Sequence, residues 1–69
     1  MRMTEFRLLM EEYFGPVRAA SVAQDHVFGS LQGLTANQAL RGGYEARQVW
    51  VAVCEAFEVP DTLRWGLPD

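Results

Sequence analysis

The sequence contains a single cysteine and a single histidine among its 69 residues. Cys54 has no second cysteine with which to form a disulfide within the chain, and one cysteine with one histidine cannot supply the ligand set of a structural zinc. The composition therefore predicts no cofactor and no metal site. An unpaired cysteine is typical of reducing compartments, so we expect a cytoplasmic protein.

Long apolar runs are also missing. No stretch approaches the length of about 18 apolar residues that marks a membrane-spanning helix. The first five residues include Arg2 and Glu5 and are not followed by the apolar segment of a signal peptide. We therefore expect neither a membrane segment nor a signal peptide.

Lysine is absent, and all six basic residues are arginines, against nine acidic residues and a net charge of −3. Phosphate groups of nucleic acids are neutralised by lysine and arginine, so this balance disfavours nucleic acid as a partner.

Hydrophobic residues, in contrast, make up 49% of the chain, which with the low net charge is unlike a disordered protein. A chain of this size forms one core, and such a core supplies roughly 3 to 5 kcal/mol of net stability. We predict a single domain over residues 1–64 and a tail over residues 65–69. Stability then comes from packing or from a partner.

The first 15 residues carry the pattern of an amphipathic helix. Thr4 is a suitable N-cap, and Gly15 followed by Pro16 is a typical stop signal. One face of the predicted helix is apolar: Phe6, Leu9, Met10 and Tyr13.

A second helix is predicted from Val17 to Phe28, because Pro16 suits a first helical turn. Its apolar stripe is narrow and made largely of small residues, and it extends one turn further: Ala20, Ala23, Val27 and Leu31. Small residues allow close approach of a neighbouring helix. Gly29 and Gly33 indicate the exit from this segment.

Two more helices follow. Thr35 and Gln38 have the spacing of a capping box, and the helix they start is short because Gly42 and Gly43 end it. The last long helix, 45–57, has the strongest pattern, with one apolar face: Ala46, Trp50, Val53, Cys54 and Phe57. A strand over 49–53 is the alternative, since β-branched and aromatic residues gather there, but the helix-forming flanks favour a helix.

The fold class predicted from these segments is all-α. We expect a compact bundle of three longer helices and one short helix, with a helix-turn-helix-like hairpin at residues 35–57 and one further turn at residues 60–64. The predicted core consists of Phe6, Met10, Tyr13, Val27, Leu31, Leu40, Trp50, Val53 and Phe57.

Four separated blocks of sequence resemble a known family of short actinobacterial proteins, domain of unknown function 3046. The blocks read MRMTEF with YFG, SVAQDHV, TANQAL and VWVAVCEAFEVP. The resemblance covers residues 1–64. It implies an intracellular bacterial protein encoded near recombination and DNA-repair genes, and it carries over no catalytic or binding residue.

A DNA-binding helix-turn-helix is one functional hypothesis. Ala39, Gly43 and Val49 have the spacing of the small residue, turn glycine and buried aliphatic residue of that motif. The surrounding charge argues against it, because residues 35–54 contain two arginines and one glutamate, and three acidic residues follow within residues 55–61. We therefore favour a purely structural hairpin and keep a helix-turn-helix DNA-binding protein as the alternative function, which the family resemblance would link to DNA repair or recombination.

Catalysis has few candidate groups. Asp25 and His26 are adjacent on a helix and so point about 100° apart, which prevents the carboxylate from orienting the imidazole. We expect His26 to make a hydrogen bond or a charge interaction near the helix end. Cys54 lies on an apolar face, where a thiol fills the core. We predict no catalytic residues and a protein that is not an enzyme.

A protein-binding or adaptor role is the function we expect. Val51 falls on the polar side of its helix, and Tyr44 lies on a nearby face, so the two would form the centre of a contact patch. The candidate partner or DNA contacts are Tyr44, Arg47, Gln48 and Val51. Trp65 would either pack back on the bundle or stand exposed. We expect a protein partner, whose identity, like the oligomeric state, the sequence leaves open.

Overall fold

The computed structural model describes residues 1–64, and the predicted tail with Trp65 lies outside the described residues. The elements in chain order are α1 (Met3–Phe14), α2 (Pro16–Asp25), β1 (Val27–Phe28), the 3-10 helix η1 (Gly29–Leu31), β2 (Leu34–Thr35), α3 (Ala36–Arg41), α4 (Ala46–Phe57) and α5 (Asp61–Arg64). The described chain is mostly helical, as predicted, but β1 and β2 add a small antiparallel sheet to the expected all-α fold.

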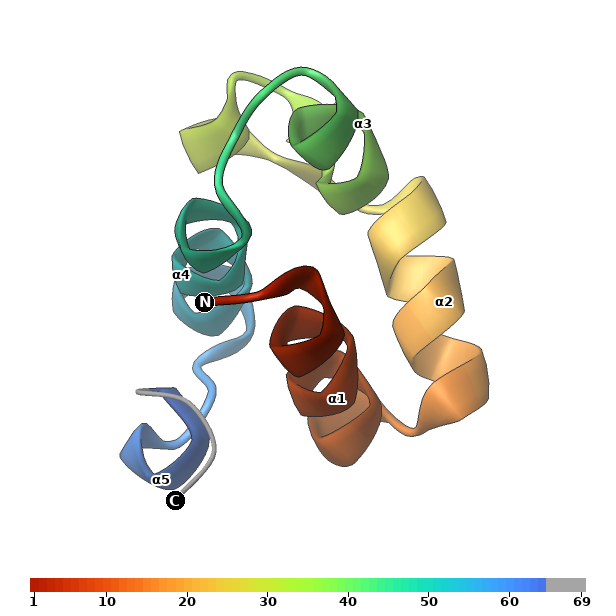
Figure 1. Ribbon diagram of the computed structural model, residues 1–69, viewed down its shortest axis with the longest axis vertical. Helices are drawn as coiled ribbons and strands as arrows, with labels where there is room; N and C mark the ends of the chain where they lie inside the picture. The colour runs from red at the N-terminus through yellow and green to blue at the C-terminus, as the bar shows by residue number, and fades with distance from the viewer. Residues whose placement is uncertain (65–69) are drawn as a thin grey trace.

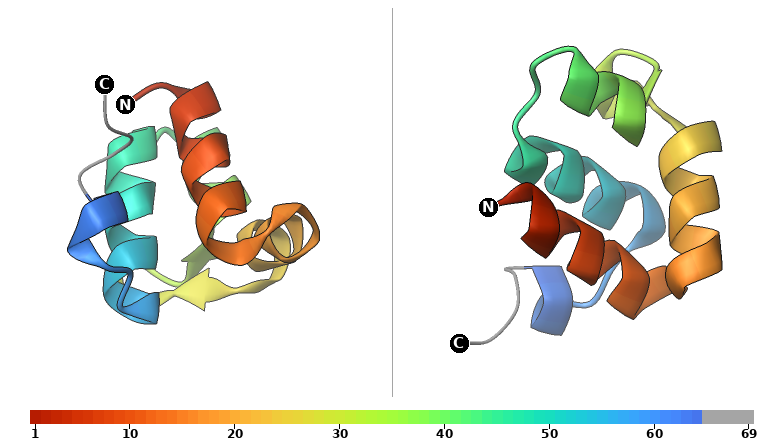
Figure 2. Two further views of the ribbon diagram at one scale, coloured as in Figure 1. Left: turned by 90° about the horizontal axis from the view of Figure 1, so that it is seen from below. Right: turned by 45° about the vertical axis from the view of Figure 1, so that its right-hand side comes forward.

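The helices surround α1 on several sides. In Figure 1, α1 lies between α4 and α2, with α3 at the top and α5 at the lower left. The two views of Figure 2 show α1 and α4 lying side by side and running in nearly the same direction, and α5 packs against α4. Within residues 1–64, no helix has the length and apolar character needed to cross a membrane.

Helix α1 begins earlier than its sequence signal suggested. Arg2 precedes the first helical residue without a side-chain cap, so the prediction of Thr4 as N-cap is wrong: Thr4 lies inside the helix. The helix ends as predicted at Gly15, whose backbone N–H donates to the Glu11 carbonyl at 2.8 Å. Gly15 has φ 85° and ψ 156°, a conformation essentially restricted to glycine, and this turn directs the chain from α1 into α2.

The predicted extension of the second helix to Phe28 is wrong, because α2 ends at Asp25 and His26 is extended. Val27 and Phe28 instead pair with Thr35 and Leu34, respectively. Successive residues of a strand point to opposite faces, so Val27 is 58% exposed and Phe28 only 2% exposed. The prediction of Val27 as a core residue is therefore also wrong.

The predictions for α3 and α4 are confirmed. Thr35 and Gln38 form the capping box, with the Gln38 N–H donating to Thr35 Oγ1 at 3.1 Å and the Thr35 N–H donating to Gln38 Oε1 at 3.0 Å. Residues 49–53 are helical, so the strand alternative is wrong. Helix α4 ends at Phe57, since Glu58 takes a left-handed conformation with φ 54°.

The core lies between α1, α4 and the β1–β2 sheet. Its largest fully buried side chains are Trp50, Phe28, Leu9, Val49, Val53 and Cys54. The ring centroids of Phe6 and Trp50 lie 6.3 Å apart in an edge-to-face arrangement that joins α1 to α4. Tyr13, Leu40 and Phe57, predicted as core residues, are half-buried and pack against its edge.

Candidate functional site

The four residues predicted as contacts line one surface groove of about 360 Å³, here named the α4 groove. Its lining consists of Ser30, Leu31, Tyr44, Glu45, Arg47, Gln48, Val51, Ala52 and Glu55. The groove runs along the exposed side of α4, and the 3-10 helix η1 contributes its other wall. The sequence prediction therefore identified residues that the fold brings together.

Helical geometry explains this convergence. Arg47 and Val51 are one turn apart on α4 and so project from the same face. Val51 is 38% exposed, as expected for its position on the polar side, whereas Tyr44 is half-buried. Gln48 also helps to cap α4, because its side-chain Oε1 accepts a hydrogen bond from the backbone N–H of Glu45 at 2.9 Å. Gln48 is thus held in place by the start of the helix.

The α4 groove is mildly acidic. Glu45, Arg47 and Glu55 are its charged residues, giving a net charge of −1. Val51 forms an apolar centre with the buried Leu31 and Ala52 beneath it. Positively and negatively charged side chains surround this centre. Such a combination of an apolar centre and a charged rim is typical of protein contacts.

A larger groove of about 640 Å³, not predicted from the sequence, opens between α1, α2 and α3. We name it the α1–α2–α3 groove, and its lining consists of Met3, Phe6, Arg7, Met10, Glu11, Pro16, Ala19, Ala20, Ala23, Gln24, Asn37, Leu40 and Arg41. The small side chains of Ala20 and Ala23 were expected to allow close approach of a neighbouring helix. In the structure Ala20 is exposed and Ala23 is half-buried, and both line this groove.

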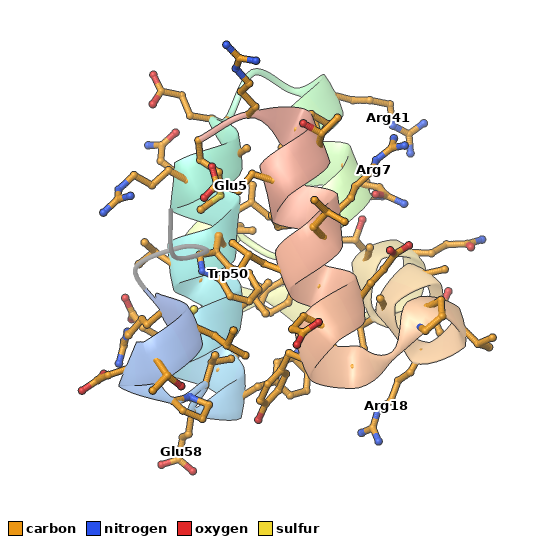
Figure 3. The ribbon with its side chains drawn as sticks, turned by 60° about the horizontal axis from the view of Figure 1, so that its bottom comes forward. Glu5, Arg7, Arg18, Arg41, Trp50 and Glu58 are labelled. Carbon is orange, nitrogen blue, oxygen red and sulfur yellow. The ribbon has the colours of Figure 1, made fainter. Side chains whose placement is uncertain are left out.

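The sequence signal for this groove was weak. Ala20 and Ala23 marked a face of small residues, but Arg7 and Arg41 are far apart in the chain, and only the fold places both at one groove. Figure 3 shows these two arginines projecting from the same side of the molecule. Arg18, also labelled in Figure 3, projects from the lower end of the molecule, away from Arg7 and Arg41.

Within residues 1–64, Asp25 and His26 contact other residues and form no hydrogen bond with each other. Asp25 accepts a hydrogen bond from the Ser21 hydroxyl at 3.4 Å. The His26 ring packs instead against two aromatic rings, with centroid distances of 4.6 Å to Phe28 and 4.9 Å to Phe57. Sequence reasoning missed this role, because it arises from the turn between α2 and β1.

Cys54 is fully buried, as predicted for a core residue. Burial raises the pKa of its thiol, the positive charge of Arg64 acts in the opposite direction, and Glu55 adds a smaller increase. A thiol held in its protonated form is a poor nucleophile. Within residues 1–64, no three histidine, cysteine, aspartate or glutamate side chains gather in a way that could hold a metal ion.

The helix-turn-helix spacing corresponds to matching structural positions. Ala39 and Val49 are fully buried, and Gly43 has φ 106° in the turn between α3 and α4. The two arginines of this hairpin lie on different surfaces, however. Arg41 lines the α1–α2–α3 groove, whereas Arg47 lines the α4 groove. The three spaced residues are therefore two buried side chains and a turn glycine, and the two arginines lie at different grooves.

Together these features define a small, mostly helical domain with one surface groove along α4 and another between α1, α2 and α3. The chain belongs to the family described as Protein of unknown function (DUF3046), which it matches over residues 1–62. No curated protein and no solved structure matches the chain.

Proposed function

We propose that this domain is a non-catalytic protein-binding or adaptor module that uses the α4 groove. The observation that supports the proposal is the convergence of Tyr44, Arg47 and Val51 on one groove. Aromatic and arginine side chains are enriched at protein interfaces, and truncation of such residues commonly costs more binding energy than truncation of others.

The nature of the groove supports binding rather than chemistry. Its charged residues are Glu45, Arg47 and Glu55, and none of the residues that line it is a histidine or a cysteine. The imidazole and the thiol of the described chain lie outside this groove, since His26 packs on the rings of Phe28 and Phe57 and Cys54 is buried in the core. We infer that this surface binds a partner and does not catalyse a reaction.

Site-specific photocrosslinking tests the proposal. A photoreactive phenylalanine analogue is placed at Val51 of the full chain in the cells that naturally make the protein. Val17, which is 85% exposed and lies on α2 outside both grooves, is the matched control position. We expect a discrete adduct with another protein from position 51 only, and its loss when Arg47→Glu is combined with the probe. Equal labelling from both positions, or none from position 51, would refute the proposal.

A DNA-binding function is the second candidate, and it is supported by the buried Ala39 and Val49 with Gly43 in the turn. In this reading the start of α4 enters the major groove and presents Arg47, Gln48 and Val51 to bases. Electrophoretic mobility shift with random duplexes at low salt decides the matter, since electrostatic attraction is then greatest. A shift that Arg47→Ala weakens supports DNA binding, and no shift eliminates it.

A further inference from the structure

The α1–α2–α3 groove, of about 640 Å³, shares no lining residue with the α4 groove. Its floor is apolar: Phe6 and Met10 of α1 and Ala19 of α2 are each at most 5% exposed. The rim is partly apolar as well, because Met3 retains 42% exposure. An apolar floor with an accessible rim provides surface that a partner can bury.

The two walls differ in a way that suits a helical occupant. On α2, Ala20 and Ala23 have short side chains, so the backbone of another helix can approach this side of the groove closely. On α1, the exposed Met3 supplies a flexible thioether side chain that adapts to varied apolar shapes. Grooves of this kind bind the apolar face of an amphipathic helix through residues at i, i+3, i+4 and i+7.

Other occupants fit less well. The sheet in residues 1–64 consists of two strands of two residues each, so it offers little edge for an added strand. A small polar ligand would need precisely placed polar groups. The polar side chains that line this groove are all exposed to solvent and are not fixed in position by burial: Arg7, Glu11, Gln24, Asn37 and Arg41.

Charge specifies the partner further. Arg7 and Arg41 stand at this groove with Glu11, which gives its lining a net charge of +1, whereas the whole chain carries −3. Within residues 1–64, the Arg41 side chain makes a single long hydrogen bond, from Nε to the Asn37 carbonyl at 3.5 Å. Figure 3 shows both guanidinium groups extending outward on the same side. A carboxylate on the edge of the occupant would complement this pair.

We propose that the α1–α2–α3 groove binds an amphipathic helix of a partner protein, with a carboxylate of that helix placed between Arg7 and Arg41. The inference concerns a different surface from the α4 groove and goes beyond the proposed function. Binding at one groove does not require binding at the other, so the two are tested by different variants.

Peptide display provides the test. The full chain is used to select from an mRNA-display library of peptides of about 18 residues with a helical pattern of apolar positions, a length at which isolated helices begin to form. The blocked variant Ala20→Arg serves for counter-selection. Ser21→Arg, on the same helix but outside the groove lining, is the matched control. We expect enriched peptides with apolar residues at i, i+3, i+4 and i+7 and a conserved aspartate or glutamate.

Affinities of the enriched peptides then locate the site. We expect Ala20→Arg to abolish binding, Ser21→Arg to leave it intact, and Arg41→Glu to weaken it by about tenfold at low salt, with recovery when the peptide carboxylate is replaced by lysine. The inference is overturned by a selection that enriches nothing over the Ala20→Arg variant, or by peptides without acidic residues. It is equally overturned if Val51→Arg abolishes binding, which would place the peptide in the α4 groove and leave the proposed function standing.

Discussion

The indole Nε1–H of Trp50 donates a hydrogen bond to the backbone carbonyl of Arg64 at 3.2 Å. Trp50 lies in the middle of α4 and is 1% exposed, whereas Arg64 ends α5. The same indole packs edge-to-face on Phe6 of α1. One side chain therefore connects α4 with both the first helix and the last helix of the described chain.

Trp50→Phe tests this connection. The variant loses a part-buried hydrogen bond worth about 0.5 to 1.5 kcal/mol and leaves a cavity where the larger indole packed, so we expect a total loss of roughly 1 to 3 kcal/mol. Urea unfolding followed by far-ultraviolet circular dichroism measures it. Arg64→Ala is the control, because it keeps the accepting backbone carbonyl. If both variants unfold at the same urea concentration, the hydrogen bond does not contribute.

The β1–β2 pairing leads to a contrast between two adjacent residues. Phe28 is 2% exposed and Val27 is 58% exposed. We expect Phe28→Leu to cost about 1 kcal/mol and Phe28→Ala about 3 to 5 kcal/mol, enough to unfold most of so small a domain. Val27→Ala should change stability by less than about 0.5 kcal/mol. Thermal unfolding of the three variants provides the measurement, and a larger effect at Val27 would mean that the segment is helical.

This contrast shows which part of the fold could not be predicted from the sequence. Helix α4 and the Thr35 to Gln38 capping box were predictable because their signals are local, within a few residues of each other. The β1–β2 sheet was not, since its two short strands gain their stability from each other and from the core beneath Phe28. The apolar pattern of Val27 and Leu31 also fits a helix, and only tertiary packing decides between the two.

The two grooves differ in the same respect. Tyr44, Arg47, Gln48 and Val51 lie on or directly before one helix, so helical periodicity sufficed to group them. The α1–α2–α3 groove depends on the direction that α2 takes after Gly15, and on the placement of Arg41 near Arg7. No local pattern encodes that direction, which is why this groove appeared only in the fold.

Gly15 is accordingly expected to be sensitive to substitution. With φ 85° and ψ 156° it occupies a region that residues with a Cβ avoid, although no atom of residues 1–64 lies within 4 Å of an added Cβ. Gly15→Ala should therefore cost about 1 to 3 kcal/mol through backbone strain alone. The measurement is the thermal unfolding midpoint.

Gly29→Ala is the matched control for that strain. Gly29 likewise has free space around an added Cβ, but its φ is not in the positive region. We expect this variant to change stability by less than about 0.5 kcal/mol. Equal destabilisation by the two alanines would show that the turn at Gly15 imposes no special backbone requirement.

Alkaline pH should weaken the fold through Cys54. Burial raises the pKa of its thiol in the folded protein, with Arg64 opposing and Glu55 adding to that shift. The unfolded chain releases this proton near the ordinary thiol value of about 8.5, while the folded chain still holds it. The contribution of the thiol to stability is thus complete below that pH and is lost as the pH rises toward the higher folded value.

The comparison of wild type with Cys54→Ala isolates this effect, because other groups titrate equally in both proteins. At neutral pH we expect the alanine variant to be less stable by about 1 kcal/mol, owing to the lost packing of a fully buried side chain. Urea unfolding at increasing pH should show the difference shrinking above about pH 8.5. A difference that stays constant into the alkaline range would mean that the folded thiol ionises as readily as the unfolded one, and that Cys54 is accessible to solvent.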